Sequence, residues 1–267
     1  MKIVDAQVHP WSSGTSTGHH RRDPIDQSVL LQEMAAAQVD RVVLVPPLWD
    51  PNGNQYALQI AARMPERFSV MGLLDPAQPD AARTLREWHS QPHMRGVRFL
   101  LNTPERLQPY FDGLLDPLWS VAEEAGIPVA LLVPGHLEIA RKVAADHPKL
   151  RIVVDHLGVP RASVGPVAFR HWPQLLELAS LPNIRVKAVG VGDYAIDPYP
   201  FKSLEEPLKA VFDAFGAERV LWGSDLSRLH HPYAQCVTHF REQLPFLTER
   251  DLERVMGRNM LDLLDWR

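Results

Sequence analysis

Short apolar runs rich in Val, Ile and Leu recur along the chain, at intervals that leave room for a helix between neighbouring runs. Most of these runs are almost continuously apolar, which is typical of strands covered on both faces. The segments between them, such as 28–38, 116–126, 136–147 and 203–216, carry apolar residues at helical spacing. The pattern predicts eight strands, within residues 2–9, 41–47, 68–74, 94–101, 127–134, 150–158, 184–192 and 219–227.

Eight strands that alternate with helices predict a parallel sheet of βα units. Eight such units in 267 residues match a closed (β/α)8 barrel, or TIM barrel, built as a single domain over residues 1–267. The alternative is an open, doubly wound sheet, which would carry a glycine fingerprint in its first strand-to-helix turn. That turn has none, and Gly190 and Gly192 stand late in the chain without a third glycine, so the barrel is favoured.

Composition and charge argue against nucleic acid and membrane as binding partners. A net charge of −4 does not suit a nucleic-acid surface, and no apolar run is long enough to span a membrane. The single cysteine, Cys236, excludes a disulfide framework and a cysteine-based zinc site, and it suits a reducing compartment. The first residues lack the pattern of a secretory signal. We therefore expect a cytoplasmic protein, monomeric or homodimeric, that binds a small molecule rather than nucleic acid or membrane.

Polar residues gather where the predicted strands end. In such a barrel these ends meet at one mouth, where active sites form. Taken singly, each residue has an ordinary explanation: a histidine can be structural, and an aspartate after a strand can cap the next helix. Burying two imidazoles, a carboxylate and a guanidinium together costs free energy without a function, so their convergence predicts a site. The candidates are Gln7, His9, Arg98, Asp155, His156, Lys187, Ser224 and Asp225.

The first predicted strand contributes an acid, an amide and an imidazole. Its period of two predicts that Asp5, Gln7 and His9 project from the same face, with Asp5 deeper in the barrel, where it would orient a neighbouring group. Two loop clusters, HHRR at 19–22 and RLHH at 228–231, are either solvated charges or contacts for an anionic substrate. No nucleophile elbow, phosphate-binding loop or metalloprotease helix motif is present.

The segments DAQVHPW, GVRF, VDHLG and WGSD, together with the closing VMGRNMLDLL, resemble an amidohydrolase-related family. The resemblance runs in order from residue 3 to the end, and it points to the branch that includes sugar-acid lactonases and 2-pyrone-4,6-dicarboxylate lactonase. It implies a (β/α)8 barrel, which the strand count predicts independently. In this family the first strand usually bears an Asp-x-His-x-His motif whose histidines bind a divalent metal. Here Asp5 and His9 match, and Gln7 stands at the first histidine.

The resemblance also implies roles for residues on other strands. Asp225 matches the aspartate that activates water, His156 matches the strand 6 histidine, and Arg98 matches an arginine that holds substrate oxygens in the lactonase branch. We therefore expect a hydrolase that opens a lactone, with Asp225 as general base and with His9 and His156 polarising the carbonyl. The substrate would be a small anionic or hydroxylated organic molecule. The residues expected to bind it are Arg98, Gln7 and Lys187.

Participation of a metal stays open on the sequence alone. Its ligands would be His9, His156 and Asp225 and the ion would be Zn²⁺, but Gln7 is a poor zinc ligand beside imidazole. Hydrolysis without a cofactor is therefore favoured, and one bound zinc ion is the alternative. Two other functions remain open: a metal-dependent decarboxylase or hydratase of the same superfamily, and a catalytically inactive barrel that binds a small acid.

Overall fold

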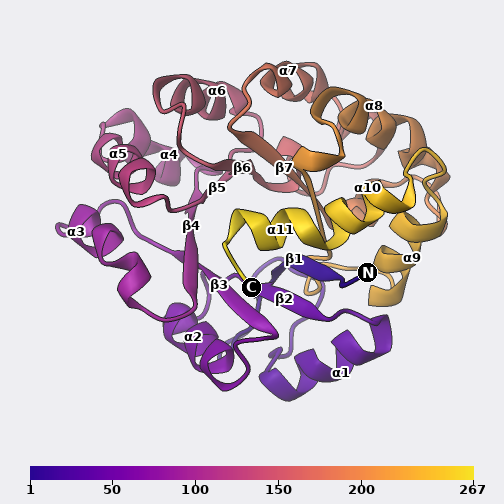
Figure 1. Ribbon diagram of the computed structural model, residues 1–267, viewed down its shortest axis with the longest axis horizontal. Coiled ribbons are helices and arrows are strands. Elements are labelled where there is room, and N and C mark those ends of the chain that lie inside the picture. Colours follow the sequence, from indigo (N-terminus) through magenta and orange to yellow (C-terminus); the bar gives the residue numbers. More distant parts are fainter.

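Eight parallel strands, hydrogen-bonded in the order of the sequence, form the centre of the computed structural model, which describes residues 1–267 (Figure 1). Each strand lies within one of the eight predicted runs. At their carboxyl ends the last strand meets the first, because the backbone N–H of Asp225 donates to the carbonyl oxygen of Gln7 at 3.0 Å. The strands are β1 Val4–Val8, β2 Arg41–Leu44, β3 Phe68–Leu73, β4 Met94–Leu100, β5 Val129–Leu132, β6 Ile152–Val154, β7 Ile184–Val189 and β8 Val220–Gly223.

Most helices surround the strands on the outside, as in a TIM barrel, and α11 crosses one end of the barrel (Figure 1). The four segments predicted from helical spacing are confirmed as α1, α5, α6 and α8. None of the helices is long and apolar enough to cross a membrane. Their bounds are α1 Gln27–Ala37, α2 Gly53–Arg63, α3 Ala81–Arg86, α4 Pro104–Phe111, α5 Asp116–Ala125, α6 Leu137–Asp146, α7 Trp172–Glu177, α8 Glu205–Phe215, α9 Tyr233–Glu242, α10 Glu249–Glu253 and α11 Asn259–Leu263.

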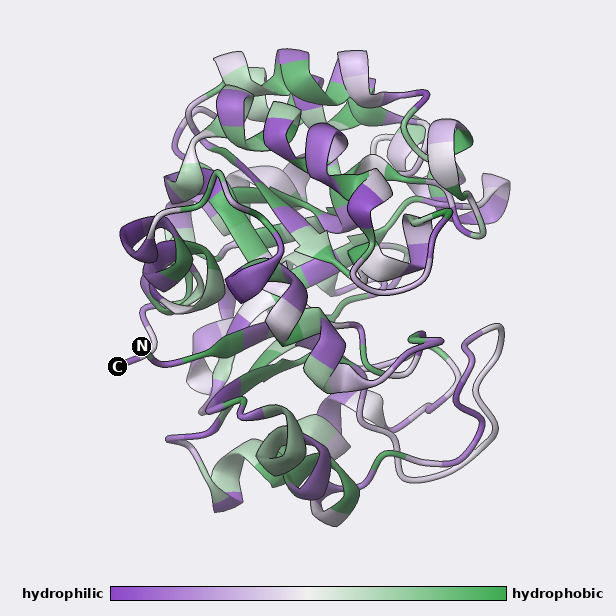
Figure 2. Cartoon of the chain, turned by 90° about the vertical axis from the view of Figure 1, so that its right-hand side faces the viewer, coloured by the Kyte–Doolittle hydropathy of each residue, from purple (hydrophilic) through white to green (hydrophobic).

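Two apolar layers hold the barrel together. The larger lies between the strands and the helices, and the smaller fills the lumen with strand residues such as Val43 and Val153. Side chains of the C-terminal segment, among them Trp266, join the lumen layer and close the end of the barrel opposite the site. Figure 2 shows this division, with hydrophobic strands at the centre and hydrophilic positions on the helices around them. The lumen is therefore a packed core, and only its mouth is free for polar chemistry.

The alternation of side chains breaks within β1. The register between β1 and β2 shifts between Asp5 and Val8, and Ala6 packs in the lumen layer. The prediction that Asp5, Gln7 and His9 share a face is therefore wrong for Asp5. A β-bulge of this kind changes which side chains face the core, and here it turns Gln7 and His9 toward the mouth while Asp5 faces α9.

The carboxylate of Asp5 instead joins β1 to β8 and α9. It accepts hydrogen bonds from the backbone N–H of Gln7 at 2.9 Å, the backbone N–H of Ser224 at 3.0 Å and the hydroxyl of Tyr233 at 2.6 Å. The contact requires glycine at position 223, because a Cβ there would lie 2.8 Å from Asp5 Oδ1. The orienting role expected for Asp5 thus acts on the backbone at the strand ends.

Candidate active site

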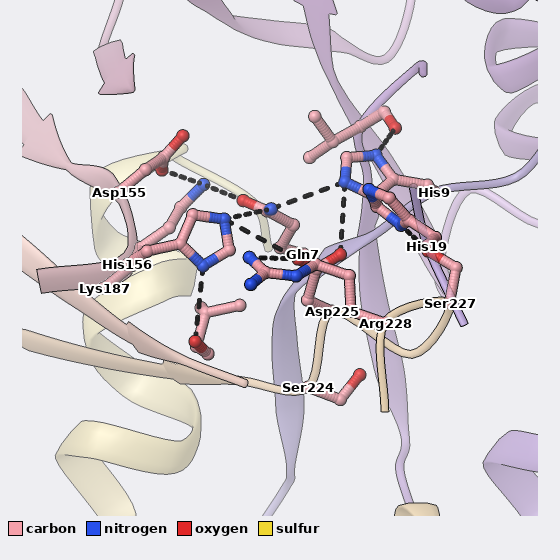
Figure 3. A network of polar contacts seen from close by, with 12 residues as sticks. Gln7, His9, His19, Asp155, His156, Lys187, Ser224, Asp225, Ser227 and Arg228 are labelled. Atoms are coloured by element: carbon pink, nitrogen blue, oxygen red, sulfur yellow. Dashed lines mark hydrogen bonds and ion pairs between the residues drawn. The ribbon is translucent and has the colours of Figure 1, made fainter. Parts of the chain in front are cut away.

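A cavity of about 230 Å³ opens at the carboxyl ends of the strands. Four of the predicted residues line it, namely His9, Arg98, His156 and Asp225. The others lie beneath its floor or behind its wall, completely buried: Gln7, Asp155, Lys187 and Ser224. The predicted residues therefore converge, but in two layers, with the titratable groups of the upper layer facing the cavity (Figure 3).

Asp225 lies at the centre of the upper layer. Its Oδ1 is 3.2 Å from His9 Nε2, and its Oδ2 is 3.6 Å from His156 Nε2 and 3.5 Å from a guanidinium nitrogen of Arg228. Burial alone would raise the pKa of Asp225, but the positive charges around it outweigh burial and hold that pKa well below the usual value. A cap for α9 is not its role, because that helix begins eight residues later, at Tyr233.

The turns that carry Asp225 and His156 are strained in the same way. Strand β6 ends at Val154 and continues as a tight 3₁₀ turn, in which His156 has a φ of 55°. Asp225 follows β8 with a φ of 53°. Left-handed backbone at a residue other than glycine costs free energy, and such conformations concentrate at functional sites. Both turns raise a polar side chain into the mouth directly after a strand.

Each of the two imidazoles is held by a backbone carbonyl. His9 Nδ1 donates to the carbonyl oxygen of Val45 at 2.6 Å, and His156 Nδ1 donates to that of Val189 at 3.3 Å. Both rings therefore carry their proton on Nδ1 when neutral, and both direct Nε2 toward Asp225. Burial, aided by the charge of Arg228, lowers the pKa of His156 to about 4, so this ring is neutral at ordinary pH.

The lower layer is a chain of buried polar groups. Lys187 Nζ donates to Gln7 Oε1 at 3.2 Å and lies 3.0 Å from Asp155 Oδ1, and Arg98 Nε donates to Asp155 Oδ2 at 2.6 Å. Gln7 and Lys187 were expected to bind substrate, but neither lines the cavity. Because both side chains are completely buried, they act on the groups above them rather than on a bound molecule.

Both loop clusters left open by the sequence reach the cavity, the first through His19 and the second through Arg228. The His19 ring lies 5.4 Å from the His9 ring and 4.8 Å from the Trp49 ring, and its Nδ1 is 2.7 Å from Ser227 Oγ. Burial lowers the pKa of His19 to about 3, so it forms a neutral wall. Its neighbour His20 instead lies against His230 of the other cluster, outside this cavity, with the two rings tilted by 56°.

Positive charge dominates the cavity wall. Four arginines line it, namely Arg98, Arg106, Arg161 and Arg228, against the single carboxylate of Asp225. Arg106 donates to the amide oxygen of Asn102, and no carboxylate lies within ion-pair distance of Arg106 or Arg161. Sequence reasoning missed these two arginines because they stand beyond the strand ends, Arg106 in α4 and Arg161 in a loop. Gly18 passes directly beside the Arg161 guanidinium with a φ of 73°, a left-handed conformation that favours glycine.

The model of one protein family, described as amidohydrolase, matches residues 4–266. The chain belongs to this family. An L-fucono-1,5-lactonase of Burkholderia ambifaria (strain ATCC BAA-244 / DSM 16087 / CCUG 44356 / LMG 19182 / AMMD) is 29% identical over 266 residues, 95% of this chain and 89% of that protein. A second L-fucono-1,5-lactonase, of Burkholderia multivorans (strain ATCC 17616 / 249), is 25% identical over 82% of this chain and 77% of that protein.

Solved structures of the amidohydrolase type have the same barrel. An amidohydrolase of Burkholderia multivorans, with bound HEPES, superposes with a TM-score of 0.82 at 19% identity, covering all of both chains. A Pseudomonas putida protein proposed to be a 2-pyrone-4,6-dicarboxylic acid hydrolase superposes with a TM-score of 0.77 at 24% identity, covering 100% of this chain and 98% of that one. At these identities the likeness concerns the fold, and it confirms the predicted barrel.

The metal site expected of many amidohydrolases does not fit this donor set. No group of three His, Cys, Asp or Glu side chains is arranged to hold a metal ion. Gln7 stands where the family usually has a histidine, and its amide nitrogen lies 3.1 Å from His156 Nε2 and 3.5 Å from His9 Nε2. An amide NH2 group donates hydrogen bonds and cannot ligate a cation. The NH2 group of Gln7 faces the Nε2 atoms of His9 and His156, whose lone pairs a metal ion would need as ligands.

Proposed function

We propose that this amidohydrolase opens a lactone ring by direct attack of water, on a substrate that carries a carboxylate. The observation that carries the proposal is the ionised carboxylate of Asp225 inside a small cavity whose other charges are positive. The two Burkholderia relatives are L-fucono-1,5-lactonases, which supports the same reaction class.

Asp225 is the proposed base. Its low pKa keeps it ionised, and therefore able to accept a proton, throughout the ordinary pH range. As the water oxygen bonds to the carbonyl carbon, the water proton passes to Asp225. Collapse of the tetrahedral intermediate breaks the bond between that carbon and the ring oxygen, which takes the proton from Asp225. The product is the open-chain hydroxy acid.

Stabilisation of the oxyanion falls to cationic groups rather than to His156. With Nδ1 bonded to a carbonyl and Nε2 facing the Gln7 amide, neutral His156 has no hydrogen left to donate. The Arg228 guanidinium lies 3.5 Å from Asp225, so it is the donor that we assign to the oxyanion. Loss of one such donor costs about 3–4 kcal/mol in well-studied hydrolases.

The proposed substrate carboxylate is held by Arg106 and Arg161. Each lines the cavity without an acidic partner, so a bound anion would complete its charge pairing. A cavity of about 230 Å³ suits a single ring, and a larger pocket, which shares Arg98 and Arg106 with it, leaves room for a substituent. A neutral sugar lactone is the second candidate, favoured by the 29% identical L-fucono-1,5-lactonase.

Turnover of a panel of lactones by the Asp225→Asn variant tests the reaction. The panel contains pyrone carboxylates and neutral sugar lactones, and hydrolysis is followed by proton release. We expect at least one lactone to be hydrolysed, and kcat/KM to fall by about 10²- to 10⁴-fold in the variant. Asp213→Asn, at an exposed carboxylate on α8 outside both pockets, is the control and should leave turnover unchanged. Unchanged turnover in Asp225→Asn would rule out the mechanism.

A further inference from the structure

We propose that Lys187 orients the Gln7 amide so that its NH2 group faces His9 and His156, and that this orientation excludes divalent metal ions from the site. The inference concerns residues beneath the cavity and does not depend on which substrate is hydrolysed. Figure 3 shows Gln7 between the two imidazoles, with Lys187 behind it.

Lys187 fixes which atom of the Gln7 amide donates and which accepts. An ammonium group only donates, so the Gln7 atom 3.2 Å from Lys187 Nζ must be the oxygen. The NH2 group of Gln7 is thereby turned toward the histidines, 3.1 Å from His156 Nε2 and 3.5 Å from His9 Nε2. The reversed amide would place an NH2 group against the ammonium and an oxygen against two lone pairs, and would lose every one of these contacts.

Backbone carbonyls determine which ring nitrogen of each neutral histidine carries the proton. Because Nδ1 of each ring donates to a carbonyl, each neutral ring can only accept at Nε2. These two Nε2 lone pairs and Asp225 are the groups that a zinc ion would bind. In this chain the amide hydrogens occupy the space in front of the lone pairs, and the ammonium group adds a positive charge directly behind them.

Lys187 itself is held in place by Asp155. That carboxylate lies 3.0 Å from Lys187 Nζ and accepts from Arg98 Nε at 2.6 Å, and all three side chains are buried. Arg98 would keep Asp155 paired if Lys187 were replaced. Substitution of Lys187 by methionine, which keeps its length, therefore removes the orienting donor without leaving a buried acid alone.

Zinc binding is the test. Wild-type protein, Lys187→Met, Gln7→Leu and Gln7→His are incubated with excess zinc chloride, passed over a desalting column and analysed for zinc, and dissociation constants are measured by chelator competition. Lys142→Met, an exposed lysine on α6, is the matched control. Far-UV circular dichroism establishes that each variant is folded. If Lys187→Met does not fold, Gln7→Leu alone tests whether the amide excludes zinc.

We expect wild type and Lys142→Met to retain well under one zinc per chain. Gln7→His, which adds an imidazole ligand, should retain close to one. Lys187→Met and Gln7→Leu should bind zinc about 10- to 100-fold more tightly than wild type, the range found for residues that orient metal ligands. The proposal is overturned if wild type holds one zinc per chain, or if its affinity equals that of the two variants.

The imidazole nitrogens provide a second, metal-free readout. In ¹⁵N spectra of the metal-free protein we expect His156 to be the Nδ1–H tautomer with a hydrogen-bonded Nε2. In Lys187→Met the amide is free to turn, so the His156 Nε2 resonance should shift toward that of an unbonded nitrogen. An unchanged resonance in a folded variant would mean that Lys187 does not orient the amide.

Discussion

At the scale of single residues, the site depends on which atom of each side chain is free. Gln7, His9 and His156 all stand where the sequence predicts them, yet their roles follow from hydrogen bonds made on the side away from the cavity. Lys187 fixes the orientation of the Gln7 amide, and two backbone carbonyls fix the tautomers of the two neutral histidines. Each of these three side chains therefore has a defined donor or acceptor atom facing the site. Residue identity alone does not contain that information.

Arg106 supplies a prediction at this scale. In Arg106→Met we expect KM for a carboxylated lactone to rise by about 10- to 100-fold with little change in kcat, because the guanidinium holds the carboxylate equally in ground and transition states. Hydrolysis of a neutral lactone should not change. Steady-state kinetics on the two substrates measure the difference, and Arg86→Met, an exposed arginine on α3, is the control. Equal loss on both substrates would contradict the assignment.

At the scale of elements, the ends of β1 and β8 are held together by one buried carboxylate. Asp5 accepts from the backbone of both strands and from Tyr233 on α9, so the turn that carries Asp225 depends on a residue outside the site. Burial raises the pKa of Asp5, which makes each of these hydrogen bonds valuable to the fold. The turn that carries Asp225 into the barrel mouth is thus positioned by a contact on the other side of the sheet.

Removal of the Tyr233 hydroxyl tests this contact. We expect Tyr233→Phe to lower the free energy of unfolding by about 1–3 kcal/mol, since a buried acceptor loses its donor. Urea denaturation of the variant beside wild type gives the value. Tyr110→Phe, at a half-buried tyrosine, is the control, with an expected change below about 0.5 kcal/mol. A similar change in both variants would mean that the Asp5 contact has no special weight.

At the scale of the whole molecule, buried histidines make stability depend on pH. Burial lowers the pKa of His19 to about 3 and those of His156 and His239 to about 4. In the unfolded chain each titrates near 6.5, so between pH 6.5 and 4 the unfolded state binds protons that the folded state does not. Their contribution to stability is therefore complete above pH 6.5 and is lost as the pH falls.

His239 lies on α9, away from the cavity, and allows this linkage to be measured. Each such histidine steepens the fall in unfolding free energy by up to about 1.4 kcal/mol per pH unit in this window. The His239→Asn variant retains a donor for the carbonyl of Pro200, which His239 Nδ1 contacts at 3.0 Å. Urea denaturation at pH 7, 6 and 5 should give a shallower slope for the variant. Parallel slopes would show that His239 is not protonated on unfolding.

The sequence by itself determined the architecture and four of the polar residues that line the cavity. Apolar runs at regular spacing specify eight strands, because only a sheet covered on both sides buries them. His9, Arg98, His156 and Asp225 could be found because they lie near or just after the carboxyl ends of strands, and strand ends of a barrel must meet at one mouth. Local order along the chain is enough for both conclusions.

The tertiary structure alone decided what the polar groups do. A one-residue irregularity turns Asp5 to α9, Lys187 of β7 lies under Gln7 of β1, and Arg161 reaches the cavity from a loop. These relations join residues up to 228 positions apart in sequence, as between Asp5 and Tyr233. Hydrogen-bond direction and charge pairing depend on distances of a few ångströms, which no local pattern of residue types encodes. For that reason the question raised by Gln7 could be posed from the sequence and answered only by its neighbours.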